Sequence, residues 1–149
     1  MAEGGLRTQP GMPADYRWAR MTLTFTGASG LGATNTNATI FTTTGTVLVR
    51  YIFGIVTTNL TGANSTVQLG TTNTLAGFIG ATTATTMLTT ANIWMSTTPT
   101  RGFFITQTIT KDTIITENVL CRSLTADTTG GVLDIYCLWA PASSNGNLV

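Results

Sequence analysis

Apolar residues recur at every second position along much of the chain, which is the period of a β-strand with one buried face. The first such stretch covers residues 17–26, where arginine and threonine fill the positions between the apolar ones. Its apolar positions are Ala19, Met21, Leu23 and Phe25. This alternation predicts a half-buried strand.

Residues 40–61 form the most apolar stretch, and they are apolar on both faces of an extended chain. One face carries Val47, Val49, Tyr51, Phe53 and Ile55, and the other carries Leu48, Ile52 and Val56. A strand of this kind is typical of the centre of a sheet or of a position between two layers. We therefore expect Phe53 to pack in the core.

Residues 131–140 have one face that is fully apolar. That face consists of Leu133, Ile135, Cys137 and Trp139. We expect it to belong to the core and Trp139 to be buried. The other face mixes Asp134 and Tyr136 with aliphatic residues, so it meets either solvent or a neighbouring subunit.

Residues 65–70, 91–96, 102–110 and 113–122 are also predicted to be strands, each bounded by Gly, Asn, Asp or Pro. Residues 75–90 fit a helical spacing as well as a strand, and we expect irregular chain with one helical turn there. Strands and turn signals at this density predict an all-β fold, namely a single antiparallel β-sandwich or jelly-roll-like domain. With 149 residues the chain is long enough to bury a core without disulfides or metals.

The two ends of the chain differ from this alternating body. Residues 1–16 hold two of the four prolines and three of the sixteen glycines, without hydrophobic periodicity. We therefore predict an extended N-terminal arm over 1–16, a β-sandwich domain over 17–141 and a polar C-terminal tail over 142–149.

Charge is scarce and unevenly placed. Charged residues make up 9% of the chain, and residues 21–110 contain only Arg50 and Arg101. A nucleic-acid partner needs several Lys or Arg side chains to displace counterions, so we expect none. Thirty-five threonines supply the surface polarity instead, and a body with so few charges suits burial against other proteins.

The residue types present exclude several common kinds of catalytic and metal site. The chain has no histidine, which removes Ser-His-Asp and Cys-His triads and every zinc site that contains histidine. Asp112 and Glu117 are the most closely spaced acids, but a solvent-exposed turn explains them better than a glycosidase pair does. Cys121 and Cys137 are too few for a metal site, and two reduced core thiols are favoured over a disulfide. We expect no enzyme, no cofactor and no metal.

No targeting or membrane segment is evident in the sequence. Residues 1–20 lack the apolar region of a secretion signal, and the longest apolar run, residues 47–56, is interrupted by Arg50 and is too short to cross a bilayer. We therefore expect no membrane partner and synthesis in the cytoplasm.

Two segments carry a resemblance to a known group of proteins. Residues 40–50, IFTTTGTVLVR, and residues 131–149, GVLDIYCLWAPASSNGNLV, resemble small Thr-rich virion structural proteins of tailed bacteriophages. The closing pattern of that group is Trp-x-Pro-Leu-Ser-x-Asp-Gly-Asn, and this chain has Ala142 and Asn145 in place of the Leu and Asp. The resemblance implies a β-sandwich or jelly-roll protein that decorates or cements the head, often as a trimer, by binding the major capsid protein on the virion surface.

Contacts with such partners are expected near the N-terminus, where apolar, aromatic and arginine side chains occur together. The candidate interface residues are Leu6, Arg7, Met12, Tyr16, Arg17, Trp18 and Arg20. Trp and Arg are enriched at protein interfaces, so Trp18 is either an interface residue or part of the core, whereas Trp94 and Trp139 are expected in the core. The alternative function is a receptor-binding or glycan-binding module of a tail fibre or adhesin, which would present exposed aromatic side chains on its loops.

Overall fold

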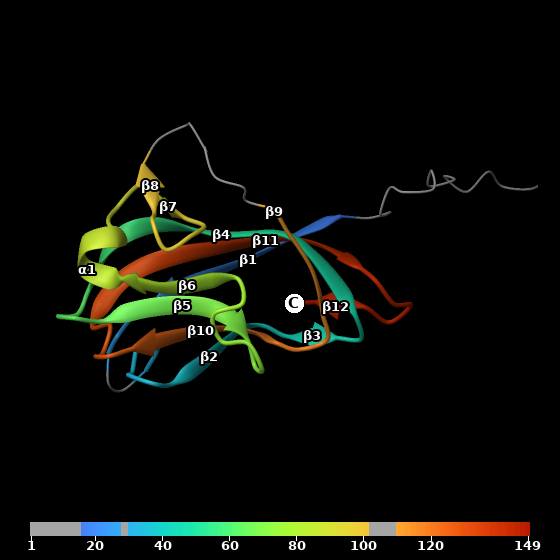
Figure 1. Ribbon diagram of the computed structural model, residues 1–149, viewed down its shortest axis with the longest axis horizontal. Helices are drawn as coiled ribbons and strands as arrows, with labels where there is room; N and C mark the ends of the chain where they lie inside the picture. Colours follow the sequence, from blue (N-terminus) through green and yellow to red (C-terminus); the bar gives the residue numbers. More distant parts are fainter. Residues whose placement is uncertain (1–15, 28–29, 102–109) are drawn as a thin grey trace, which may run out of the picture.

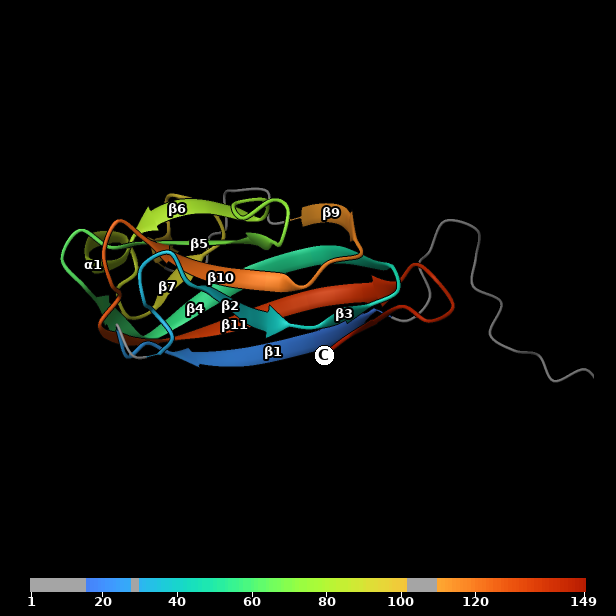
Figure 2. The same ribbon diagram turned by 90° about the horizontal axis from the view of Figure 1, so that it is seen from below.

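Two antiparallel β-sheets face each other across one hydrophobic core in the computed structural model, which describes residues 16–27, 30–101 and 110–149 (Figure 1). The larger sheet has the order β1 (Arg17–Thr24), β11 (Gly130–Pro141), β4 (Val47–Thr61), β7 (Asn92–Trp94) and β8 (Thr100–Arg101), and β9 (Thr110–Ile115) also pairs with β4. The smaller sheet has the order β2 (Asn37–Phe41), β10 (Val119–Leu124), β5 (Thr66–Thr71) and β6 (Ile79–Thr83). The two sheets lie one above the other in Figure 2. The predicted antiparallel β-sandwich is confirmed.

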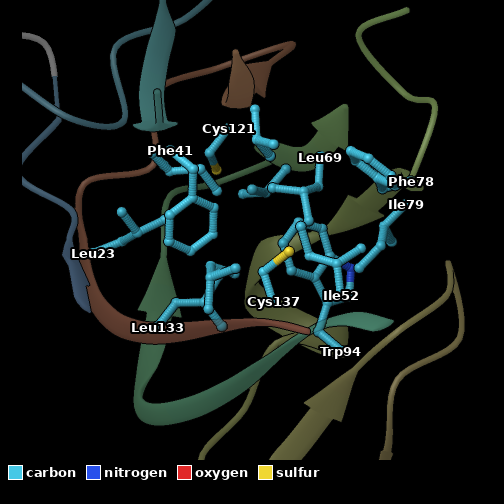
Figure 3. Close-up of a cluster of buried hydrophobic side chains, with 14 of the residues drawn as sticks. Leu23, Phe41, Ile52, Leu69, Phe78, Ile79, Trp94, Cys121, Leu133 and Cys137 are labelled. Atoms are coloured by element: carbon cyan, nitrogen blue, oxygen red, sulfur yellow. The ribbon is translucent and has the colours of Figure 1, made fainter. Parts of the chain in front are cut away.

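The core lies between the two sheets, and both contribute large apolar side chains to it (Figure 3). The larger sheet supplies Leu23, Ile52, Trp94, Leu133 and Cys137, and the smaller sheet supplies Phe41, Leu69, Ile79 and Cys121. Trp94 and Trp139 are both buried, as the sequence predicts. The alternation of residues 131–140 is also confirmed, since its apolar face is buried throughout.

Phe53 is not in the core, contrary to the expectation from the alternation of residues 40–61. Val49 lies opposite Trp139 but Tyr51 lies opposite Leu138, so β4 has one extra residue at Arg50. This β-bulge shifts the alternation by one position. Val47 and Val49 point inward before it, Ile52 and Val56 point inward after it, and Phe53 moves to the outer face, where it is half-buried.

Two other segments differ from the sequence-based expectations. The strand predicted over 113–122 is two strands, β9 and β10, because residues 116–118 turn the chain from one sheet to the other. Residues 75–90 contain β6 followed by the one-turn helix α1 (Ala84–Met87), so the expected helical turn is present but it follows a strand. The strand predicted over 102–110 lies almost entirely outside the described residues.

The C-terminal residues are held to the body of the protein. The short strand β12 (Asn147–Leu148) pairs with β3 (Thr43–Thr44), and the Leu148 side chain is buried. The backbone of Val149 also exchanges hydrogen bonds with that of Thr42. The polar residues 142–146 that precede β12 form the turn that brings it back to the sandwich.

Candidate functional site

Aromatic and charged side chains gather on the outer face of the larger sheet, on the three neighbouring strands β1, β11 and β4. Arg20 lies directly opposite Tyr136, and Tyr136 lies directly opposite Phe53. Directly opposed residues of antiparallel strands share a face, and the other face of these strands is the core. We call the group Trp18, Arg20, Phe53, Asp134 and Tyr136 the aromatic face.

The three rings of the aromatic face contact one another. Phe53 and Tyr136 stack with centroids 5.4 Å apart and an interplanar angle of 15°, and Trp18 meets Phe53 edge-on, at 6.2 Å and 82°. The Arg20 guanidinium lies over the Tyr136 ring, 5.5 Å from its centroid. Trp18 is 58% exposed, and so is the most exposed aromatic side chain that the structure describes on this sheet. The cluster therefore presents a preorganised aromatic surface around one accessible indole.

A polar group holds Arg20 in place beside the rings. Nη2 of Arg20 donates to Oδ2 of Asp134 at 2.7 Å, and the Thr22 hydroxyl donates to the other carboxylate oxygen. The Asp134 side chain is largely buried beneath these partners. The hydrogen bond from Thr22, together with the Arg20 guanidinium, holds the pKa of Asp134 below its ordinary value. The carboxylate is thus ionised at neutral pH and orients a guanidinium that is still exposed to solvent.

The structure brings together two of the seven residues predicted as an interface. Trp18 and Arg20 both lie on the aromatic face, and the exposure of Trp18 favours an interface role over a core role. Arg17 lies on the opposite side of β1, with its guanidinium 5.6 Å from the centroid of the Trp139 ring. Tyr16 directly precedes β1 and is half-buried. The remaining candidates, Leu6, Arg7 and Met12, lie outside the described residues.

Sequence reasoning missed Phe53, Asp134 and Tyr136 as parts of this site. Phe53 was assigned to the core because the bulge at Arg50 leaves no obvious mark in the sequence. For Asp134 and Tyr136 a signal did exist, since they occupy the mixed face of residues 131–140 that was expected to meet solvent or a subunit. Their partners Thr22 and Arg20 are more than a hundred residues away in the chain.

The two acidic residues considered as a catalytic pair are separately engaged. The Asp112 carboxylate accepts a hydrogen bond from Arg50 at 2.8 Å, and the Glu117 carboxylate accepts from the backbone N–H of Asn73 at 2.9 Å and from the Asn73 side chain. A cavity of about 270 Å³ between β9 and the turn after β5 is lined by Glu117, Phe78, Ile114 and several threonines. Apart from the Glu117 carboxylate, the polar groups that line this cavity are threonine hydroxyls and backbone groups. Glu117 therefore has no second titratable side chain beside it in the cavity with which to form an acid–base pair.

Both cysteines are free and buried, which agrees with the interpretation as two reduced core thiols. Burial raises the pKa of each thiol to about 12, so neither forms a reactive thiolate at neutral pH. Within the described residues there is no cluster of three or more Cys, Asp or Glu side chains able to hold a metal ion. Over the same residues, no helix is long and apolar enough to cross a membrane.

No protein-family model matches the chain, and no curated protein or solved structure is significantly similar to it. The aromatic face is therefore the feature on which a functional proposal rests.

Proposed function

We propose that this chain is a structural virion protein, a head decoration or cement protein that binds the shell of major capsid protein and stabilises it as a homo-oligomer, with the trimer as the expected form. The observation that carries the proposal is the aromatic face. An exposed Trp packed among Phe, Tyr and an oriented Arg is the combination of residue types that supplies most binding energy at protein interfaces. The resemblance of residues 40–50 and 131–149 to phage virion proteins supports the capsid shell as the partner.

The packing of the rings favours a protein partner over a sugar. A pyranose ring stacks on a free aromatic face, but Tyr136 has Phe53 stacked on it and the Arg20 guanidinium over it. Phe53 has Tyr136 and Trp18 against it. Trp18 alone, within this group, offers a largely uncovered ring. Glycan binding by a tail-fibre or adhesin module is therefore the second candidate function, and it depends on that one indole.

The experiment is a binding assay with undecorated capsids. Purified protein is added to heads that lack it, and the occupancy and the melting temperature of the heads are measured. We expect Trp18→Ala to lower the apparent affinity at least tenfold, because hot-spot Trp residues typically contribute about 2 kcal/mol or more. The matched control is Val149→Ala, which shortens another apolar side chain that is 68% exposed but whose backbone bonds Thr42, outside the larger sheet.

A second variant tests the N-terminal arm. Deletion of residues 2–16 is expected to leave folding intact, because no residue of β1 is removed, and to weaken attachment through the loss of the arm's apolar and arginine contacts. Full occupancy with unchanged thermal stability of the heads would show that the arm is dispensable. Equal occupancy of wild type, Trp18→Ala and Val149→Ala would overturn the assignment of the aromatic face, and binding of a glycan that Trp18→Ala abolishes would favour the second candidate.

A further inference from the structure

Strand β1 is an edge strand of the larger sheet, and its outer edge has no partner strand among the described residues. It lies beside β11 (Figure 2), and the two strands pair without a register shift over all eight residues from Arg17 to Thr24. Its side chains are mostly exposed, and they include two large apolar ones, Trp18 at 58% and Met21 at 39%. An edge of this kind presents a row of backbone groups that can pair with another chain.

The hydrogen bonding to β11 identifies which backbone groups of β1 face the edge that has no strand partner among the described residues. The N–H of Phe25 donates to the carbonyl of Gly131, and in antiparallel strands such bonded positions recur at every second residue. The residues of β1 whose side chains point inward therefore direct their backbone N–H and C=O groups at β11. The remaining residues direct these backbone groups away from β11; they are Trp18, Arg20, Thr22 and Thr24. The free edge ends there, because the N–H of Thr26 donates to the carbonyl of Leu31 in the loop that follows.

The other sheet edges that the structure describes are short, bulged or carry Lys, and β1 has none of these three protections. Proteins shield edges by keeping them short, by bulges and by charges, Lys above all. Strands β2 and β6 have five residues each and both pair with a register shift, and β8 has two residues. Strand β9 contains Lys111 and is bent at Asp112, where φ is 45°. Strand β1 is longer than all of these, unbroken, and free of Lys and Pro. Its two charged residues are Arg17 and Arg20, and the Arg20 guanidinium is paired with Asp134 of the same sheet.

We propose that β1 pairs antiparallel with β1 of a second copy of this chain, about a twofold axis that passes beside Met21. In this register Trp18 lies opposite Thr24 and Arg20 lies opposite Thr22, so all four free residues of each copy gain partners. Met21 lies opposite the partner's Met21, and its exposed side chain is covered. The result is one continuous sheet that runs through both copies.

The charges and the loop after β1 select this register from its neighbours. A shift of two residues in one direction places Arg20 opposite the partner's Arg20, and like charges directly opposite each other are destabilising. A shift of two residues in the other direction places Trp18 opposite Thr26, whose N–H is already bonded to Leu31. Only the register centred on Met21 uses every free group without opposing charges.

The pairing does not rest on the capsid proposal, because it uses the backbone edge of β1 and not the ring contacts of the aromatic face. It is compatible with that proposal. A twofold contact makes dimers of isolated chains, and if a threefold contact also forms, it joins neighbouring trimers. The aromatic faces of the two copies then lie side by side on one extended sheet.

The first test compares Thr22→Pro with Thr22→Ala. Both variants lose the Thr22 hydroxyl that bonds Asp134, but only proline removes the N–H that points to the free edge. The bond pattern to β11 is untouched in both. We expect light scattering to show a dimer or a hexamer for wild type and Thr22→Ala, and half that mass for Thr22→Pro at the same concentration. A wild-type monomer at high concentration, or a wild-type mass that Thr22→Pro leaves unchanged, would overturn the proposal.

The second test reads the register by cross-linking. In the proposed pair the two copies of residue 21 form a non-hydrogen-bonded pair with Cα atoms about 4.5 Å apart, within the range that a disulfide spans. Met21→Cys is therefore expected to give a covalent dimer under mild oxidation, whereas Thr22→Cys, which faces Arg20 of the other copy, is not. The native Cys121 and Cys137 are buried and do not interfere. Equal cross-linking of both variants, or of neither, would contradict the register.

A third sample separates β1 from the N-terminal arm as the source of self-association. The chain without residues 2–15 keeps all of β1, so it is expected to keep the wild-type mass and the Met21→Cys cross-link. Loss of both on deletion would assign the contact to the arm and refute the pairing of β1. Capsid binding is measured separately with Trp18→Ala. If either the capsid proposal or the β1 pairing fails, the other can therefore still be tested.

Discussion

Phe53→Ala should destabilise the protein less than Phe41→Ala, although both changes remove the same ring from a β-strand. Phe41 is 2% exposed and lies in the core, whereas the bulge at Arg50 turns Phe53 to the outer face. Truncation of a core Phe typically costs about 3–5 kcal/mol. Phe53 is partly buried on the outer face, so its truncation leaves no core cavity but loses most of a burial energy of about 1.5–3 kcal/mol, plus about 0.5–1.5 kcal/mol for its contact with Tyr136. We expect a total of about 2–3 kcal/mol.

Urea unfolding followed by far-ultraviolet circular dichroism measures both values, with the shift in midpoint interpreted at a common m-value. All samples are compared at one protein concentration, because self-association would add to the apparent stability. A cost for Phe53→Ala equal to that for Phe41→Ala would place Phe53 in the core. That result would refute the bulge, and with it the composition of the aromatic face.

Three further changes have directions that follow from the structure. Thr82→Val should cost about 1–3 kcal/mol in urea unfolding, because it leaves the buried indole N–H of Trp94 without the acceptor that lies at 2.9 Å; no loss would contradict this hydrogen bond. The pKa of Asp134 is lowered on folding, so its stabilising contribution is complete above about pH 4, the ordinary carboxylate range, and is lost as the pH falls through the lower folded value. The melting temperature should thus drop below about pH 4, and less so in Asp134→Asn, whereas the absence of histidine predicts little change between about pH 5 and 8. The pKa values of Cys121 and Cys137 are raised from 9.0 to about 12, so stability is lost as the pH rises between these values, and a variant with both cysteines changed to Ala should lose less of it from pH 8 to 10 than wild type does.

The sequence predicted those parts of the fold that depend on a local period of two. Residues 131–140 keep strict alternation, so the burial of Trp139 and the mixed outer face with Tyr136 could both be anticipated. Strand β4 alternates as clearly on either side of Arg50, but the extra residue there is set by the pairing with β11 and β9. When both faces of a strand are apolar, a bulge that exchanges the inward and outward positions leaves no visible break in the hydrophobic pattern of the sequence.

The division of residues 113–122 into two strands depends on long-range contacts in a similar way. Residues 116–118 contain no Gly or Pro. Two hydrogen bonds stabilise their turn: the Glu117 carboxylate accepts one from the backbone of Asn73, and the Asn118 side chain accepts one from the backbone of Thr43. Both partners lie more than forty residues away in the chain. Local turn chemistry gives little sign of such a bend.

Only part of the candidate site could be predicted from the sequence, because the rest depends on the same long-range contacts. Trp18 and Arg20 could be selected by residue type and by their place at the start of the first strand. Their neighbours on the surface come from β11 and β4, and the pairing of these strands with β1 decides which side chains meet. The candidate site is thus assembled by the register of three strands that are far apart in the sequence.

A reconstruction of phage heads to which the purified protein has been added is the most direct test of the proposed decoration role. We expect density for the sandwich on the outside of the shell, with the aromatic face against the major capsid protein, and loss of this density for Trp18→Ala. Bare heads at saturating wild-type protein, or density in which the aromatic face points into solvent, would contradict it.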